Sequence, residues 1–110
     1  VIEESAIPVL WQGAQGGRAR LLAGTAGPDM IELWQWEMQP GERFTSPGHP
    51  AGTFELLHVN EGVLTLTVDE TVTQVAAGKS AVAKTEAAHG YANEGKNVLR
   101  FTMTVAEFHR

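Results

Sequence analysis

The sequence lacks cysteine altogether, and basic residues and long apolar runs are scarce. Without cysteine the chain forms neither a disulfide nor a thiolate metal site, which fits a cytoplasmic protein. The sequence has 8 Lys and Arg residues and 13 Asp and Glu residues, which give a net charge of −5. We therefore do not expect this segment to bind the phosphate backbone of DNA by itself. No apolar run approaches the roughly 18 residues of a membrane-spanning helix, and no signal peptide pattern is present.

The amino-acid composition of the chain is typical of one globular domain. It has 110 residues, 43% hydrophobic and 19% charged, which predicts a single domain over residues 1–110. The first residue is Val rather than Met, from which we expect a piece of a longer protein or a processed chain.

Short segments of strand-forming residues, separated by turn residues, dominate the sequence. The expected strands cover residues 30–38, 53–59, 63–68, 71–75 and 99–105. The Ala-containing window 75–88 is interpreted as strand and turn, because Gly78 interrupts it and its apolar spacing is irregular. Residues 13–17, which hold three glycines, predict a long hairpin turn. This spacing of strands and turns predicts an all-β sandwich or barrel.

Glu55 is a carboxylate inside an otherwise apolar strand segment. By the two-residue alternation of a strand it shares a face with Leu57 and Val59, whereas Leu56 and His58 face the other way. A buried carboxylate costs on the order of several kcal/mol unless it is paired. We therefore expect Glu55 to face a cation, a metal or a polar ligand. The alternative is an edge strand that leaves Glu55 in water.

Two histidines gain meaning from their spacing relative to Glu55. His49 lies in a Pro- and Gly-containing stretch just before the strand of Glu55, and His89 lies on a candidate strand among small residues. Taken singly, His89 is more readily explained as a hydrogen-bonded structural residue than as a ligand, and His49 as an exposed loop residue. Together with Glu55 they form a pattern that indicates a binding site.

This pattern resembles the two motifs of the cupin superfamily, over residues 41–62 and 78–93. The matching positions are His49, Glu55 and Gly62 in the first motif, and Gly78, His89 and Asn93 in the second. The resemblance implies an all-β, single-domain, cupin-type β-barrel, also called a double-stranded β-helix or jelly roll. It also implies a ligand or metal site that contains His49, Glu55 and His89.

The sequence departs from the family pattern at one metal-ligand position. Ala51 stands where the family has the second histidine of the first motif, and in the second motif Lys84 and Glu86 replace Pro and Gly. Two histidines and one carboxylate are still able to bind Zn, Ni, Mn or Fe, with positions left open to water or substrate. Because one ligand is missing, a metal-bound and a metal-free site both remain as alternatives.

A narrower resemblance covers residues 9–105. Residues 32–70, followed by HGYAN at 89–93, look like the C-terminal cupin domain of bacterial Xre-type helix-turn-helix transcriptional regulators. The resemblance implies a small-molecule effector, a homodimer, and DNA binding only through an N-terminal helix-turn-helix domain. No helix-turn-helix pattern occurs in the sequence of this chain.

Three functions are consistent with these observations. The first is an effector-sensing and dimerising domain. The second is a metal-dependent enzyme, such as a dioxygenase, isomerase or decarboxylase, in which Tyr91 assists the metal ligands. The third is a structural, dimerising barrel with a vestigial pocket. The missing second histidine favours sensing over catalysis.

Aromatic and remaining histidine side chains are assigned to the core, the lumen or an interface. Trp36 and Tyr91 are predicted to contact the ligand, although core or dimer packing is the more common role of a pair such as Trp34 and Trp36. The predicted lumen residues are Trp36, Phe44, Leu57, Tyr91 and Met103, and the predicted interface residues are Trp34, Trp36, Phe54, Leu56 and Phe101. We expect His58 in an interface or on the surface, and His109 in solvent.

Overall fold

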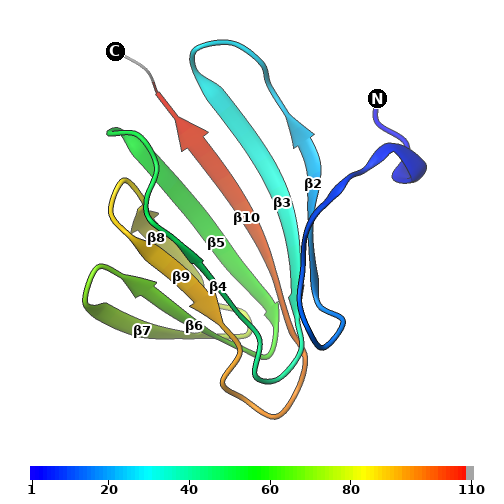
Figure 1. The fold of residues 1–110 in the computed structure, drawn as a ribbon, viewed down its shortest axis with the longest axis vertical. Coiled ribbons are helices and arrows are strands. Elements are labelled where there is room, and N and C mark those ends of the chain that lie inside the picture. The colour runs from blue at the N-terminus through cyan, green and yellow to red at the C-terminus, as the bar shows by residue number, and fades with distance from the viewer. Residues whose placement is uncertain (109–110) are drawn as a thin grey trace.

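The computed structural model describes residues 1–108, which form two antiparallel sheets that face each other (Figure 1). The six-stranded sheet has the order β1-β2-β3-β10-β5-β8, and the four-stranded sheet has the order β4-β9-β6-β7. The strands are β1 (Val9–Gln12), β2 (Arg18–Gly24), β3 (Met30–Met38), β4 (Arg43–Ser46), β5 (Thr53–Glu61), β6 (Val63–Val68), β7 (Thr71–Ala76), β8 (Ser80–Lys84), β9 (His89–Ala92) and β10 (Leu99–Glu107), after a 3-10 turn, η1 (Glu4–Ala6). The all-β prediction is confirmed.

Each of the five strands expected from the sequence is present. Three of them continue by one or two residues beyond the expected end, to Glu61, Ala76 and Glu107. The predicted glycine-containing turn joins β1 to β2, and Gly13 N donates a hydrogen bond to Gly17 O at 2.8 Å. Strand β8 falls inside the window interpreted as strand and turn. Strand β4 was not expected, because four residues are too few to show an alternation.

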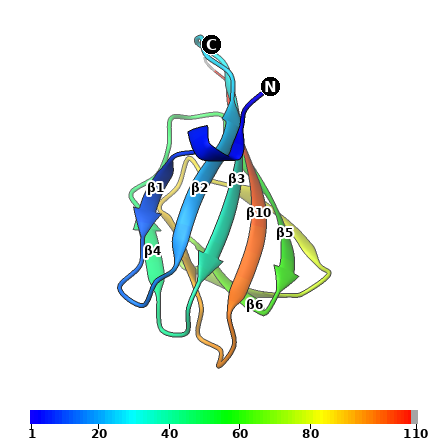
Figure 2. The same ribbon diagram turned by 90° about the vertical axis from the view of Figure 1, so that its right-hand side faces the viewer.

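Strand β10 lies between β3 and β5, although it is far from both in sequence (Figure 2). Val105 pairs with Glu32 on one side and with Glu55 on the other. Residues directly opposite each other on antiparallel strands point to the same face of the sheet. The pairing therefore sets Glu32, Val105 and Glu55 in one row on the inner face.

The hydrophobic core lies between the two sheets. Trp36 stacks on Phe101, with ring centroids 5.6 Å apart and an interplanar angle of 6°. The buried apolar side chains are Ala19, Trp36, Met38, Leu57, Val59, Leu64, Leu66, Val75, Ala83, Tyr91, Leu99, Phe101, Met103 and Val105. Trp36 and Phe101 are therefore core residues, and their assignment to a dimer interface is wrong.

The outward faces follow the predicted alternation of β5. His58 is exposed and its Nδ1 lies 2.7 Å from Ser80 Oγ on β8, which confirms that it points away from Glu55. His109 lies outside the described residues. Within residues 1–108, no helix is long and apolar enough to cross a membrane.

Candidate metal and ligand site inside the barrel

Glu55 occupies the centre of a polar cluster on the inner face of β5. Its side chain is fully buried. Tyr91, on β9 in the opposite sheet, donates its hydroxyl hydrogen to Glu55 Oε1. Oε2 lies 3.3 Å from His49 Nε2 and 3.5 Å from His89 Nε2. The fold thus brings three of the other four predicted site residues to the carboxylate of Glu55, and the fourth, Trp36, lines the cavity beside it.

The orientation of His89 is fixed by the backbone next to it. Nδ1 lies 3.0 Å from Ala87 O, and a carbonyl only accepts, so Nδ1 carries the hydrogen of this bond. In the neutral ring Nε2 is then an acceptor that faces Glu55 Oε2, another acceptor. Both atoms are buried without a hydrogen-bond partner among the described residues. Two buried acceptors 3.5 Å apart repel each other, so this position favours a cation, either a proton on Nε2 or a metal ion.

His49 is positioned by contacts between the β4–β5 loop and the residues that precede β9. His49 N donates to Thr85 O at 2.9 Å, and Gly52 N donates to Glu86 Oε2 at 2.8 Å. Gly48 has φ +120° and lies against the backbone of Glu86, so a side chain there would be strained and would collide. The His49 side chain is 34% exposed and opens the cluster to solvent. Glu86, a departure from the family motif, thus anchors the loop of a candidate ligand.

The surroundings of Glu55 keep it ionised. Burial raises its pKa, but the close approach of His49 and His89 and the hydrogen bond from Tyr91 together outweigh burial and lower the pKa from 4.5 to about 2. Burial lowers the pKa of His89, but the interaction with Glu55 and the hydrogen bond to the Ala87 carbonyl raise it by more. The resulting pKa lies above 6.5. Burial and the charge of Glu55 raise the pKa of Tyr91 well above 10, so Tyr91 remains a neutral donor.

The donor set fits a divalent transition metal. Ligand atoms of His49, Glu55 and His89 all lie within 4.8 Å of one another. Ligands at about 2.0–2.2 Å from one ion are roughly 3 Å apart, so the distances of 3.3 and 3.5 Å from Glu55 Oε2 to the two imidazoles need little adjustment. Two imidazoles and a carboxylate suit Zn, Ni, Mn or Fe. Ala51 lies in an exposed turn and adds no donor, which leaves three protein ligands.

A small cavity of about 100 Å³ extends from this cluster into the lumen. It is lined by Glu32, Trp34, Trp36, Phe44, Ser46, His49, Glu55, His89, Tyr91, Met103 and Val105. Of the predicted lumen residues, only Leu57 does not line it. Glu32 was missed by sequence reasoning, because no motif includes it. Its alternation with Trp34 and Trp36 was the available signal.

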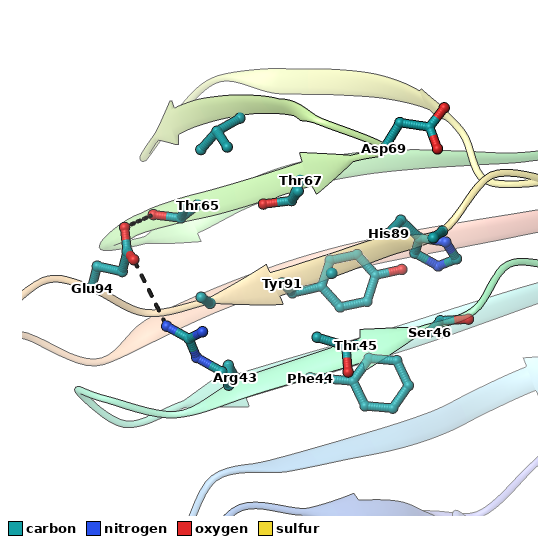
Figure 3. A pocket seen from close by; sticks show the side chains of 14 residues that line it. Arg43, Phe44, Thr45, Ser46, Thr65, Thr67, Asp69, His89, Tyr91 and Glu94 are labelled. Carbon is teal, nitrogen blue, oxygen red and sulfur yellow. Dashed lines mark hydrogen bonds and ion pairs between the residues drawn. The ribbon is translucent and has the colours of Figure 1, made fainter.

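A larger hollow, of about 390 Å³, lies on the outer face of the four-stranded sheet (Figure 3). Its lining includes three threonines, and Glu94 accepts a hydrogen bond from Thr65 at 3.1 Å and pairs with Arg43 at 3.9 Å. Arg43, Thr65 and Glu94 are thus partnered with one another. Among the described residues of this lining, only His89 has an unpartnered buried side-chain atom, and that atom, Nε2, faces Glu55 in the lumen.

Comparison with known proteins now identifies the family. The model of the cupin domain, Cupin_2, matches residues 34–105, and the chain belongs to this family. No curated protein matches the chain.

Solved structures with the same fold include regulators and an enzyme-like protein. An HTH_3 family transcriptional regulator from Vibrio cholerae has a TM-score of 0.75 and 22% identity, over 84% of this chain and 52% of that chain. This chain therefore spans about half the length of that regulator. The cupin domain of an XRE family transcriptional regulator from Enterobacter cloacae has a TM-score of 0.66 and 20% identity, over 73% and 83%. A predicted oxalate decarboxylase from Thermotoga maritima has a TM-score of 0.66 and 16% identity, over 96% of each chain.

Proposed function

We propose that residues 1–110 form one small-molecule-sensing and dimerising cupin domain of a bacterial transcriptional regulator. The observation that carries this proposal is the buried pair of unpartnered acceptors, Glu55 Oε2 and His89 Nε2, in a cavity that opens through His49. Likeness to two regulators supports the attachment to a DNA-binding domain. DNA would be contacted through an N-terminal helix-turn-helix domain, and such a regulator would act in the cytoplasm.

His49, Glu55 and His89 would hold a divalent metal, and Tyr91 would keep the carboxylate oriented. A bound divalent ion would supply positive charge and open coordination positions for an oxygen or nitrogen atom of the effector. Effector binding would then shift the equilibrium between two conformations of the barrel. This shift would reposition the attached DNA-binding domain.

Calorimetric titration of the chelator-treated protein with Zn²⁺ and Ni²⁺ tests the site. We expect one metal per chain and an increase in melting temperature. At a free metal concentration of about 100 Kd the stabilisation is about 2.7 kcal/mol. Effector candidates are then titrated into both forms. Absence of metal binding together with absence of any small-molecule binding would refute a sensing role.

A metal-dependent enzyme, for example a dioxygenase, isomerase or decarboxylase, is the second candidate. Tyr91 favours it, because a neutral hydroxyl next to the metal ligands is able to orient a substrate or donate a proton. If the metal-loaded protein turns over small carboxylates or sugars, and Glu55→Gln loses this activity, the function is catalysis rather than sensing.

The homodimer is supported by apolar side chains on the outer face of the six-stranded sheet. Leu56 and Val82 pair across β5 and β8, and they are 54% and 74% exposed. Leu33 on β3 is 39% exposed on the same face. A two-fold dimer uses the same surface on both subunits, so a row of apolar residues is self-complementary.

A further inference from the structure

The cavity holds a second carboxylate at a distance from the candidate metal ligands. Glu32 and Glu55 both pair with Val105, one from each neighbouring strand, so they lie in the same row of the inner face. Two strand spacings separate their Cα atoms by roughly 10 Å. Both side chains line the same cavity. A molecule of a few heavy atoms is therefore able to reach from one carboxylate towards the other.

Aromatic rings surround the space between these carboxylates. Trp34, Trp36 and Phe44 line the cavity, and the Trp36 centroid lies 6.3 Å from that of Trp34 and 5.3 Å from that of Phe44. Glu32 Oε1 accepts a hydrogen bond from Trp34 Nε1 at 3.3 Å, which orients the carboxylate beside the ring. Aromatic faces next to a carboxylate attract organic ammonium groups.

The charges of the residues that line the cavity also favour a cationic ligand. Among the described residues that line the cavity there are two glutamates and two histidines, but neither Lys nor Arg. A metal ion on His49, Glu55 and His89 would compensate for Glu55 but leave Glu32 unpaired by any cation of the cavity. An anionic group next to Glu32 would therefore be repelled, and a cationic group would be attracted.

One further polar atom remains without a partner. Trp36 is 3% exposed, and its indole Nε1 has no hydrogen-bond acceptor among the described residues. An indole N–H is a donor only, so the group that satisfies it must be an acceptor. A carboxylate or carbonyl oxygen of the ligand is the corresponding group.

We propose that the cavity recognises a small ammonium compound that also carries an oxygen acceptor, with Glu32 and the neighbouring Trp34 binding the ammonium group and Trp36 Nε1 donating to the oxygen. The oxygen end faces the other half of the cavity, where Glu55 and the two histidines lie. This inference rests on the proposed sensing function and names the chemical class of its effector. Glu32 is a binding residue of this site that the cupin motifs do not include.

Three matched probes test the assignment: 4-aminobutyrate, 4-hydroxybutyrate and succinate. All three are short chains that end in a carboxylate. The other end is an ammonium group in 4-aminobutyrate, a hydroxyl in 4-hydroxybutyrate and a second carboxylate in succinate. Calorimetry is performed on the Zn²⁺-loaded protein. Because an ionic hydrogen bond and cation–π contact are lost with the hydroxyl, we expect 4-aminobutyrate to bind about tenfold or more tightly than either analogue.

Glu32→Gln separates the ammonium contact from the rest of the site. We expect this variant to lose the preference for 4-aminobutyrate while it retains the affinity for 4-hydroxybutyrate and for Zn²⁺. Glu70→Gln, in the exposed turn between β6 and β7, makes the same charge change outside the cavity and should behave as the unmodified protein.

The outcomes distinguish this inference from the function on which it rests. Equal or tighter binding of 4-hydroxybutyrate or succinate overturns the ammonium assignment but leaves a small-molecule site in place. An unchanged preference in Glu32→Gln overturns the role of Glu32. Absence of binding by all three probes counts against the ammonium site, and against sensing as well if the wider panel of effector candidates also fails to bind.

Discussion

At the scale of single residues, the two oxygen atoms of Glu55 have different roles. Oε1 accepts the hydrogen of Tyr91, and Oε2 faces the imidazoles of His49 and His89. This division fixes the carboxylate from one side and leaves its other oxygen available to a cation. The Ala87 carbonyl does the same for His89, so both buried ligands are oriented before any ion binds.

Tyr91→Phe removes the hydrogen bond that orients Glu55 and leaves the aromatic ring in the core. Second-sphere hydrogen bonds of this kind are worth about 10- to 100-fold in metal affinity. We therefore expect Zn²⁺ affinity to fall by about tenfold or more in calorimetric titration. His58→Gln removes an exposed histidine that points away from the lumen and should leave the affinity unchanged. Equal affinities of Tyr91→Phe and the unmodified protein would contradict an orienting role.

The stability of the metal-free protein should depend on pH through the same cluster. The pKa of His89 is raised above 6.5, so its contribution is present below pH 6.5 and is lost as pH rises through the raised pKa. The pKa of Glu55 is lowered from 4.5 to about 2, so its contribution is present above pH 4.5 and is lost as pH falls. The contribution of the cluster is therefore greatest between pH 4.5 and 6.5.

Melting temperatures measured against pH in the presence of a chelator test this expectation. The difference between the unmodified protein and Glu55→Gln should be largest between pH 4.5 and 6.5 and smaller on either side. A difference that is independent of pH would mean that charge interactions of Glu55 and His89 do not stabilise the fold.

Sequence reasoning reached the ligand candidates but not the residues that hold them. His49, Glu55 and His89 were predicted together because their spacing resembles the family motifs, and alternation placed Glu55 on the same strand face as Leu57 and Val59. Glu86 was seen only as a departure from the motif. Its contact with Gly52 depends on the folded path of two loops that are 34 residues apart, which a strand pattern does not contain.

At the scale of elements, Glu42 links two turns at one end of the barrel. Its side chain is 5% exposed, and Oε2 accepts hydrogen bonds from Gln15 N at 2.6 Å and Gly17 N at 3.3 Å. Oε1 accepts from Gln39 N at 2.6 Å. One carboxylate thus connects the β1–β2 turn with the turn between β3 and β4. The sequence shows Glu42 as an ordinary charged residue next to a Pro-Gly turn, so this role was not predictable from pattern.

Glu42→Gln should destabilise the protein by about 1–3 kcal/mol, because an amide replaces one acceptor oxygen by a donor that faces backbone N–H groups. Chemical denaturation measures the free energy of unfolding. Glu70→Gln, at an exposed turn, should change it by no more than about 0.5 kcal/mol. If Glu42→Gln lowers the free energy of unfolding by no more than this control does, the two turns are held by other contacts.

At the scale of the whole molecule, the two sheets differ in what their outer faces present. The four-stranded sheet carries threonines and the Arg43–Glu94 pair around its outer hollow. The six-stranded sheet presents Leu33, Leu56 and Val82, with Thr104 of β10 between Leu56 and Leu33 in the strand pairing. The sequence predicted that Leu56 faces away from Glu55. It did not reveal that strands so distant in the chain align their exposed apolar residues into one row.

A charge placed in this row tests the proposed dimer. In a two-fold interface Leu56→Glu introduces two carboxylates, one from each subunit, and both would lose water on association. We expect the dimer to weaken by at least about tenfold in sedimentation equilibrium. Val72→Glu is the matched control, since Val72 is 63% exposed on the other sheet, and it should leave association unchanged. If Leu56→Glu remains as dimeric as the unmodified chain, or if Val72→Glu alone dissociates it, the dimer does not use the outer face of the six-stranded sheet.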